Sequence, residues 1–119
     1  MTAYRLSRLA RSDIVEILAW SVEHFGGAAR DRYQALLAAA INDLADDPFR
    51  PGSRPRPDIG PGTRIWHLRA NRDRTGLPRV NTPRHMVVYR VDDGIVIIGR
   101  VLHDAMDISD HVGDEHFDK

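Results

Sequence analysis

The sequence predicts an α+β fold in which a small antiparallel sheet, including a strand from the N-terminus, carries a two-helix hairpin on one face, in the order βααβββ. Three observations support this prediction. Two apolar stripes with helical spacing occupy residues 8–46, a β-hairpin pattern occupies 86–102, and a shorter strand pattern lies at 64–68. With 119 residues, the chain is long enough for one hydrophobic core and too short for two.

The first elements are a short strand at residues 4–6 and a helix over 8–25. Ser7 is a suitable N-cap, because its hydroxyl can accept a hydrogen bond from a helical N–H that has no backbone partner. Apolar residues then recur at steps of three and four as far as Phe25. This stripe predicts a helix that is buried along one side.

A second helix follows after a short break. Gly26 and Gly27 can adopt the left-handed conformation that ends a helix. The next apolar stripe covers residues 29–44 and must stop before Pro48, which disfavours helix in the residue before it. Residues 48–62 hold five prolines, so we expect an extended connection there without regular structure. The two helices therefore form an antiparallel hairpin.

The clearest strand signal is the hairpin pattern. Apolar β-forming residues at 86–91 lead into Asp92-Asp93-Gly94, and a second apolar run follows at 95–102. The glycine tolerates a positive φ, which tight hairpin turns require. Between the strand at 64–68 and this hairpin lies a polar, turn-rich stretch, residues 71–83.

Charge is unevenly placed along a chain whose formal net charge is zero. Residues 1–103 hold 16 Arg and 11 acidic residues, whereas 104–119 hold one Lys and six acidic residues. The basic excess is greatest in 50–90 and would attract an acidic protein surface or a phosphate backbone, although an Arg-rich solvated face is the simpler alternative. We divide the chain into a domain, 1–107, with a basic insertion near 69–84, and an acidic tail, 108–119, expected to be mobile.

Composition excludes several classes of protein. The chain has no cysteine, which removes disulfides, thiolate metal sites and thiol nucleophiles. No window is apolar enough for a membrane-spanning helix, and the N-terminus has no apolar signal core. We expect a cytoplasmic protein with no membrane association.

The polar residues do not form a recognisable catalytic or metal-binding motif. His103-Asp104 and Asp107 are the closest grouping of possible ligands, but the tail offers no firm scaffold for a metal. His67 and His85 would lie on neighbouring strands, where packing is a commoner role than proton transfer. Asp13 and Glu16 lie near a helix start, where the helix dipole explains them. We therefore predict no catalytic residue, no metal and no cofactor.

Several short motifs together resemble a known family. They are Tyr4-Arg5-Leu6-Ser7, Asp13-Ile14 with Glu16-Ile17, Phe25-Gly26, Tyr33, Pro48, Gly62 with Arg64, His85 with Tyr89-Arg90, and Arg100-Val101-Leu102-His103 followed by Met106-Asp107. The chain resembles the ParE toxins of the RelE/ParE superfamily. The resemblance implies a toxin of a type II toxin–antitoxin module, built from a small sheet and a helical hairpin and neutralised by an antitoxin whose C-terminal segment wraps around it.

The resemblance also bears on the target. RelE-type members cut messenger RNA on the ribosome with basic side chains on the central strands, whereas ParE-type members act on DNA gyrase. This chain has Met86 and Asp104 at positions where the nucleases carry basic residues, and a carboxylate would disfavour the negative charge that develops during phosphodiester cleavage. It also has no tyrosine after Tyr89. We therefore expect inhibition of gyrase by binding, with no enzymatic step.

The expected partners are a ParD-like ribbon-helix-helix antitoxin and DNA gyrase, with operator DNA contacted only through the antitoxin. One alternative is a ribosome-dependent mRNA endoribonuclease that uses Arg64, Arg100, His103 or His111. Another is a drifted, non-toxic member that only binds its antitoxin. The exposed candidates for target or antitoxin contact are Arg64, Arg90, Arg100, His103, Asp104, Met106 and Asp107.

The chain departs from the family pattern in one place. Residues 68–84 are longer than the short hairpin connections that the family has between its second and third strands. This segment is either an added contact arm for gyrase, DNA or antitoxin, or a surface insertion that is tolerated at small cost. The arginines of the proposed arm are Arg69, Arg72, Arg74, Arg79 and Arg84.

Overall fold

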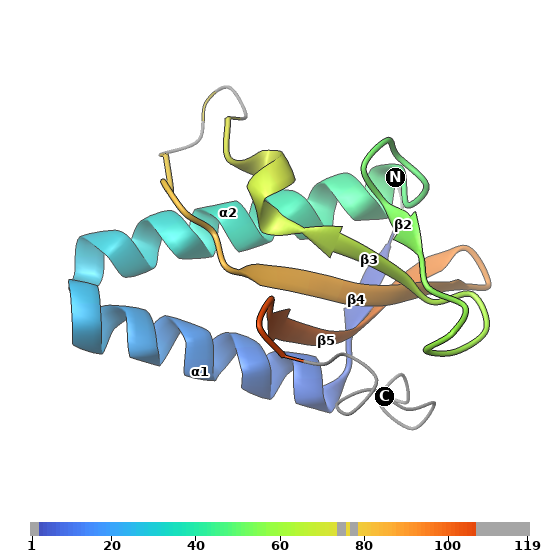
Figure 1. Cartoon of the computed structure of the whole chain (residues 1–119), viewed down its shortest axis with the longest axis horizontal. Helices are drawn as coiled ribbons and strands as arrows, with labels where there is room; N and C mark the ends of the chain where they lie inside the picture. Colours follow the sequence, from blue (N-terminus) through green and yellow to red (C-terminus); the bar gives the residue numbers. More distant parts are fainter. Residues whose placement is uncertain (1–2, 74–75, 77–78, 107–119) are drawn as a thin grey trace.

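The computed structural model describes residues 3–73, 76 and 79–106, and it contains one five-stranded sheet with strand order β1-β5-β4-β3-β2 (Figure 1). The elements are β1 (Tyr4–Leu6), α1 (Arg8–Phe25), α2 (Gly27–Asp46), β2 (Arg54–Pro55), β3 (Arg64–His67), the 3-10 helix η1 (Leu68–Asn71), β4 (His85–Asp92) and β5 (Ile95–His103). The α+β fold with an N-terminal strand and a helical hairpin is thereby confirmed. Arg74, Asp107, His111 and the acidic tail 108–119 lie outside the described residues.

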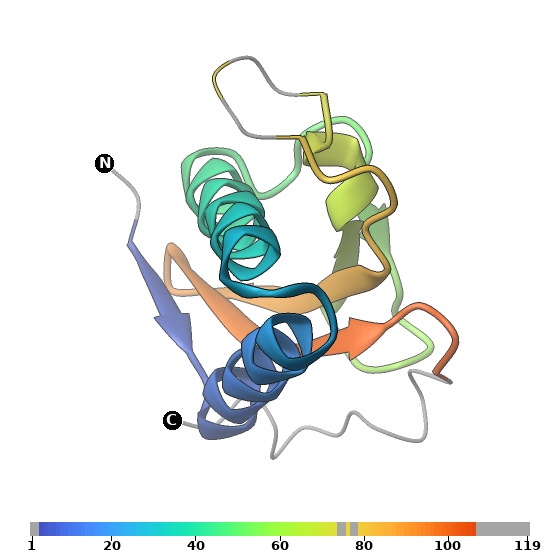
Figure 2. The same ribbon diagram turned by 90° about the vertical axis from the view of Figure 1, so that its left-hand side faces the viewer.

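Helices α1 and α2 run antiparallel and cover one face of the sheet (Figures 1 and 2). Between the two layers lies the main core, where Leu36 and Leu44 of α2 pack with Tyr89 and Ile98 of the central strands. A smaller cluster around Val88 forms on the opposite face. Successive residues of β4 alternate between the two clusters, as the twofold repeat of a strand requires.

The sheet is mixed, which corrects the expectation of a purely antiparallel one. β1 pairs in parallel with β5, the last strand in the chain, while the other neighbouring strands are antiparallel. The apolar pattern of a three-residue strand does not identify the strand it pairs with, so the direction of pairing could not be predicted from the sequence. The expectation of no regular structure in 48–62 is also wrong, because Arg54–Pro55 forms an edge strand on β3. Proline is tolerated at such an edge.

The cap and turn signals at Ser7, Gly26 and Asp93-Gly94 are confirmed, whereas Gly27 has no positive φ and begins α2. Ser7 accepts a hydrogen bond from the Ala10 N–H at 3.0 Å and begins α1. Gly26, with φ of +88°, separates the two helices. Asp93 and Gly94 both have positive φ, at +53° and +75°, which suits a tight turn between twisted strands.

The start of α1 closes the edge of β5 beyond the end of β1. β1 pairs only with residues 96–98, and Ser7 continues the edge by donating from its N–H to the Ile98 carbonyl and from its hydroxyl to the Gly99 carbonyl. The Asp13 carboxylate then accepts the Val101 N–H at 3.0 Å. Asp13 therefore bonds to the sheet, and the helix-dipole explanation is wrong because its position is beyond the first turn of α1.

Two features are absent from the part of the chain that the structure describes. No helix there is long and apolar enough to cross a bilayer. No group of three or more His, Asp or Glu side chains is arranged there to hold a metal ion.

Candidate functional site

Three histidines meet at one end of the sheet. β3 ends at His67, β4 begins at His85 and β5 ends at His103. His85 and His103 are opposite each other in the strand register, and their rings meet edge to face with centroids 5.4 Å apart. The antiparallel pairing of β3, β4 and β5 thus brings together side chains that are far apart in the sequence.

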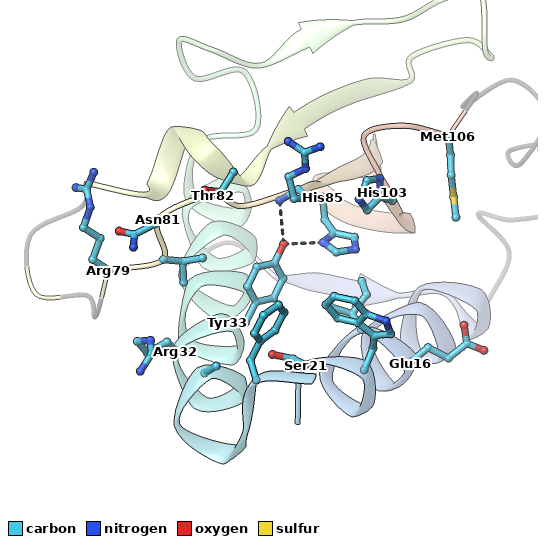
Figure 3. Close-up of a pocket in the computed structure, with 16 residues that line it drawn as sticks. Glu16, Ser21, Arg32, Tyr33, Arg79, Asn81, Thr82, His85, His103 and Met106 are labelled. Atoms are coloured by element: carbon cyan, nitrogen blue, oxygen red, sulfur yellow. Dashed lines mark hydrogen bonds between the residues drawn. The ribbon is translucent and has the colours of Figure 1, made fainter. Parts of the chain in front are cut away.

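Tyr33 of α2 is hydrogen-bonded to the ring of His85. Its hydroxyl accepts a hydrogen bond from the Arg84 N–H at 3.3 Å and lies 2.6 Å from Nδ1 of His85, to which it donates (Figure 3). Burial lowers the pKa of His85 to about 4, and repulsion from His103 adds to this effect. Burial also raises the pKa of Tyr33 to about 12. Both side chains are therefore uncharged at neutral pH.

Asp104 places a carboxylate directly after β5. Its Oδ2 accepts a hydrogen bond from Nε2 of His67 at 3.0 Å, while Nδ1 of His67 accepts the Arg69 N–H. The hydrogen bond from His67 holds the pKa of Asp104 below its usual range. Nε of Arg84 lies 3.9 Å from Oδ1 of the same carboxylate.

His103 fixes the turn that follows β5. Its Nδ1 accepts the Ala105 N–H at 3.0 Å, and its carbonyl accepts the Met106 N–H. Met106 is 45% exposed at the mouth of a groove next to this turn. Asp107, the remaining candidate of this motif, lies outside the described residues.

The groove has a volume of about 610 Å³ and lies between the helical hairpin, the segment before β4 and the end of β5 (Figure 3). One wall is the C-terminal half of α1, where Trp20 is 53% and Phe25 is 68% exposed. The exposure of Phe25 corrects its assignment to the buried stripe of α1. Three arginines also line the groove: Arg32, Arg79 and Arg84.

Three of the predicted contact arginines lie elsewhere and are held by side chains of their own domain. Arg100 makes two hydrogen bonds to Asp13, with Nε–Oδ2 and Nη2–Oδ1 distances of 2.8 and 2.9 Å, so its expected free exposure is corrected. Arg64 donates to Ser53 and covers the ring of Phe49. Arg90 donates from Nε to the hydroxyl of Thr63.

The basic segment before β4 is partly neutralised by its own acid. Arg72 and Arg79 both contact the carboxylate of Asp73. Arg69 is exposed on η1, and Arg84 is exposed next to Asp104. Arg74 cannot be placed with them, because it lies outside the described residues.

The chemistry of this end of the molecule favours binding over bond cleavage. Cleavage of a phosphodiester requires fixed cations directed at the reacting phosphate. Among the described residues, Arg100 and Arg64 are turned to Asp13 and Ser53, and the group that follows β5 is an anion. His85 is poorly suited to act as a general base, because its pKa of about 4 lies far below neutral pH and its Nδ1 is bonded to the Tyr33 hydroxyl.

Sequence reasoning missed the groove residues that come from the helices. Tyr33 was read as part of a buried stripe, although a hydroxyl on such a stripe signals a polar partner. Trp20 falls outside the stripe of α1, and this was the available signal that it faces solvent. Arg32 carries no comparable signal, because an exposed arginine on a helix is ordinary.

A helical hairpin packed on a small sheet is the architecture that the resemblance to the ParE toxins implies, and the structure shows it together with a groove at the ends of the central strands. Residues 4–108 match the model of the family described as ParE toxin of type II toxin-antitoxin system, parDE. The curated protein Toxin ParE1 of Caulobacter vibrioides (strain ATCC 19089 / CIP 103742 / CB 15) is 34% identical over 113 residues, which cover 95% of this chain and 100% of that protein. The chain belongs to the ParE toxin family.

A solved structure supports the fold independently. The structure titled "Chromosomal ParDE TA system from P. aeruginosa" aligns with a TM-score of 0.63 and 18% identity, and the alignment covers 87% of this chain and 96% of that one. At this identity the likeness concerns the fold alone. The resemblance drawn from the sequence motifs is thus confirmed at the level of family and fold.

Proposed function

We propose that this ParE-family toxin inhibits DNA gyrase by binding and is neutralised by a ParD-like ribbon-helix-helix antitoxin, through which alone it contacts operator DNA. Gyrase as the target implies action in the cytoplasm. Family membership supports the toxin role. The observation that carries the binding mode is the bidentate pairing of Arg100 with Asp13, because it removes a strand cation from any role in cleavage.

The contact candidates differ in how accessible they are. His103 and Met106 line the groove, and Asp104 lies beside His103 in the same turn. All three remain our candidates for contact with target or antitoxin. Arg64 and Arg90 are half-buried and also remain candidates, Arg64 beside Ser53 and Arg90 beside Thr63.

A supercoiling assay tests the target. Purified toxin is added to gyrase, relaxed plasmid and ATP, and we expect loss of supercoiling with linear DNA released from trapped cleavage complexes. Addition of the antitoxin before the toxin should restore supercoiling. Full supercoiling at toxin concentrations that saturate the antitoxin would refute the gyrase proposal.

The second candidate is a ribosome-dependent mRNA endoribonuclease, and the meeting of His67, His85 and His103 at the ends of three strands favours it, because histidine is the commonest residue in general acid–base catalysis. Translation extracts with primer extension on messenger RNA would show new cuts near the ribosomal A site. Cuts that disappear in a folded His103→Gln variant would establish this alternative. If induction in cells leaves growth unchanged, the drifted, non-toxic alternative is the correct one.

A further inference from the structure

The described parts of the added segment, 68–73 and 79–84, are built into the domain. Asn71 is 3% exposed, donates to the Asp43 carboxylate at 2.9 Å and accepts the Trp66 indole N–H at 2.7 Å. On the returning side, Val80 packs against the main core and Pro83 is buried. A surface insertion that is merely tolerated would leave the core unchanged, whereas this segment contributes side chains to it.

This anchoring makes the segment one wall of the groove. Arg79, Val80 and Arg84 line it from this side, facing the aromatic surface of α1. On α1, Trp20 stacks on His24 with centroids 4.2 Å apart and meets Phe25 edge to face at 5.5 Å. Rings that are held in place and exposed to water are suited to contact apolar side chains of a partner.

The rim of the groove is positively charged. Glu16 is its acidic residue, against Arg32 from α2 and Arg79 and Arg84 from the added segment. The side chains of Arg79 and Arg84 are each 58% exposed, so their contacts with Asp73 and Asp104 leave donors available to a partner. Within the described part of the chain, Arg32 makes no ion pair. An apolar floor with a cationic rim complements a segment that combines apolar side chains with carboxylates.

We propose that the added segment is the specificity element of this groove and that it selects a partner segment with apolar side chains for Trp20 and Phe25 and with carboxylates for Arg79, Arg84 and Arg32. The occupant is the C-terminal segment of the cognate ParD-like antitoxin, so the inference rests on the antitoxin part of the proposed function. Charge at the rim discriminates among antitoxins, because an antitoxin without the matching carboxylates desolvates the exposed parts of the arginines and offers them no acceptor in return.

The test uses the full-length toxin and its proposed cognate ParD-like antitoxin, purified separately and titrated at low and high salt. We expect the double reversal Arg79→Glu/Arg84→Glu to weaken binding by roughly a hundredfold at low salt and to flatten the salt dependence. Arg84→Glu alone, at an exposed position directly before β4, should weaken antitoxin binding by roughly tenfold. Arg69→Glu is the matched control, because Arg69 lies in the same segment but does not line the groove; its affinity should stay near that of the wild type.

A charge swap supplies the decisive readout. An antitoxin whose C-terminal carboxylates are replaced by arginine should bind the double-reversal toxin better than the wild-type toxin, which a merely structural role of Arg79 and Arg84 would not produce. Thermal unfolding checks that each variant is folded. If Arg84→Glu and the folded double reversal bind like the wild type, the specificity role is refuted. If the wild-type toxin itself does not bind the antitoxin, the proposed partner is wrong and this inference fails with it.

Discussion

Arg100 of β5 and Asp13 of α1 form a bidentate ion pair that joins the first helix to the last strand. Asp13 also accepts the Val101 N–H, so one carboxylate satisfies both a guanidinium and a backbone donor at the edge of the sheet. The hydrogen bonds that Arg100 donates to Asp13 raise the pKa of Arg100 above its usual value. The pair is shielded from solvent, with side-chain exposures of 16% and 11%.

Breaking this pair should destabilise the fold. Asp13→Ala leaves the Arg100 guanidinium and the Val101 N–H without their acceptor, and we expect the free energy of unfolding to fall by about 3 kcal/mol. Urea denaturation measures the loss, and Glu23→Gln, at an exposed acid on the same helix, should leave stability unchanged. If Arg100→Ala abolished toxicity at unchanged stability, Arg100 would be a contact residue instead.

The cap of α1 should make a separate contribution to stability. Ser7 both caps the helix and donates to the Gly99 carbonyl at 2.7 Å, so Ser7→Ala removes two hydrogen bonds in a buried position. We expect a loss of about 1–2 kcal/mol in denaturant unfolding. Ser12→Ala on the exposed side of the same helix is the control and should be neutral or slightly stabilising. Equal stabilities for the two variants would contradict the assigned role of Ser7.

Stability should decrease on acidification because of His85. Its folded pKa of about 4 lies below the ordinary histidine value of 6.5, so the unfolded chain binds a proton in that interval while the folded chain does not. The contribution is therefore fully present above pH 6.5 and is lost as pH falls towards 4, by about 3 kcal/mol at most. Asp104, whose pKa is lowered, adds a further loss only below about pH 4.

Unfolding measured in urea from pH 7 to 4 tests this. In His85→Gln the loss between pH 6.5 and 4 should be smaller than in the wild type, because the group that protonates on unfolding has been removed. His24→Gln, at an exposed histidine of α1, should retain the wild-type profile. Parallel profiles for the wild type and His85→Gln would show that another group governs this interval.

Asn71 should determine how firmly the added segment is held. Asn71→Ala removes the partner of the Trp66 indole and one partner of Asp43, and we expect a loss of about 2 kcal/mol together with faster amide exchange in η1. Asn71→Asp should be worse, because it places a second carboxylate against Asp43. Arg69→Ala, exposed on the same short helix, is the control. Unchanged exchange in η1 after Asn71→Ala would mean that other contacts fix the segment.

Several elements were predictable from the sequence because their causes are local. The extent of α1, its Ser7 cap, the break at Gly26 and the Asp93-Gly94 turn depend on residues that lie within a few positions of one another. A stripe of apolar side chains, or a glycine that tolerates positive φ, influences the backbone conformation only within a few residues. The family motifs could be recognised in the sequence for a similar reason, because each one is a short run of neighbouring residues.

The groove and the pairing of the charges depended on tertiary structure. Tyr33 and His85 are 52 positions apart, and Asp13 and Arg100 are 87 apart, so nothing in either neighbourhood indicates the partner. The sequence by itself determined the two helices, the strands β1, β3, β4 and β5, and the basic composition of the segment before β4, but not the edge strand β2. Only the packing of α1 and α2 on the sheet decided which arginines are held by the domain and which line the groove, because a charged side chain finds its partner through space.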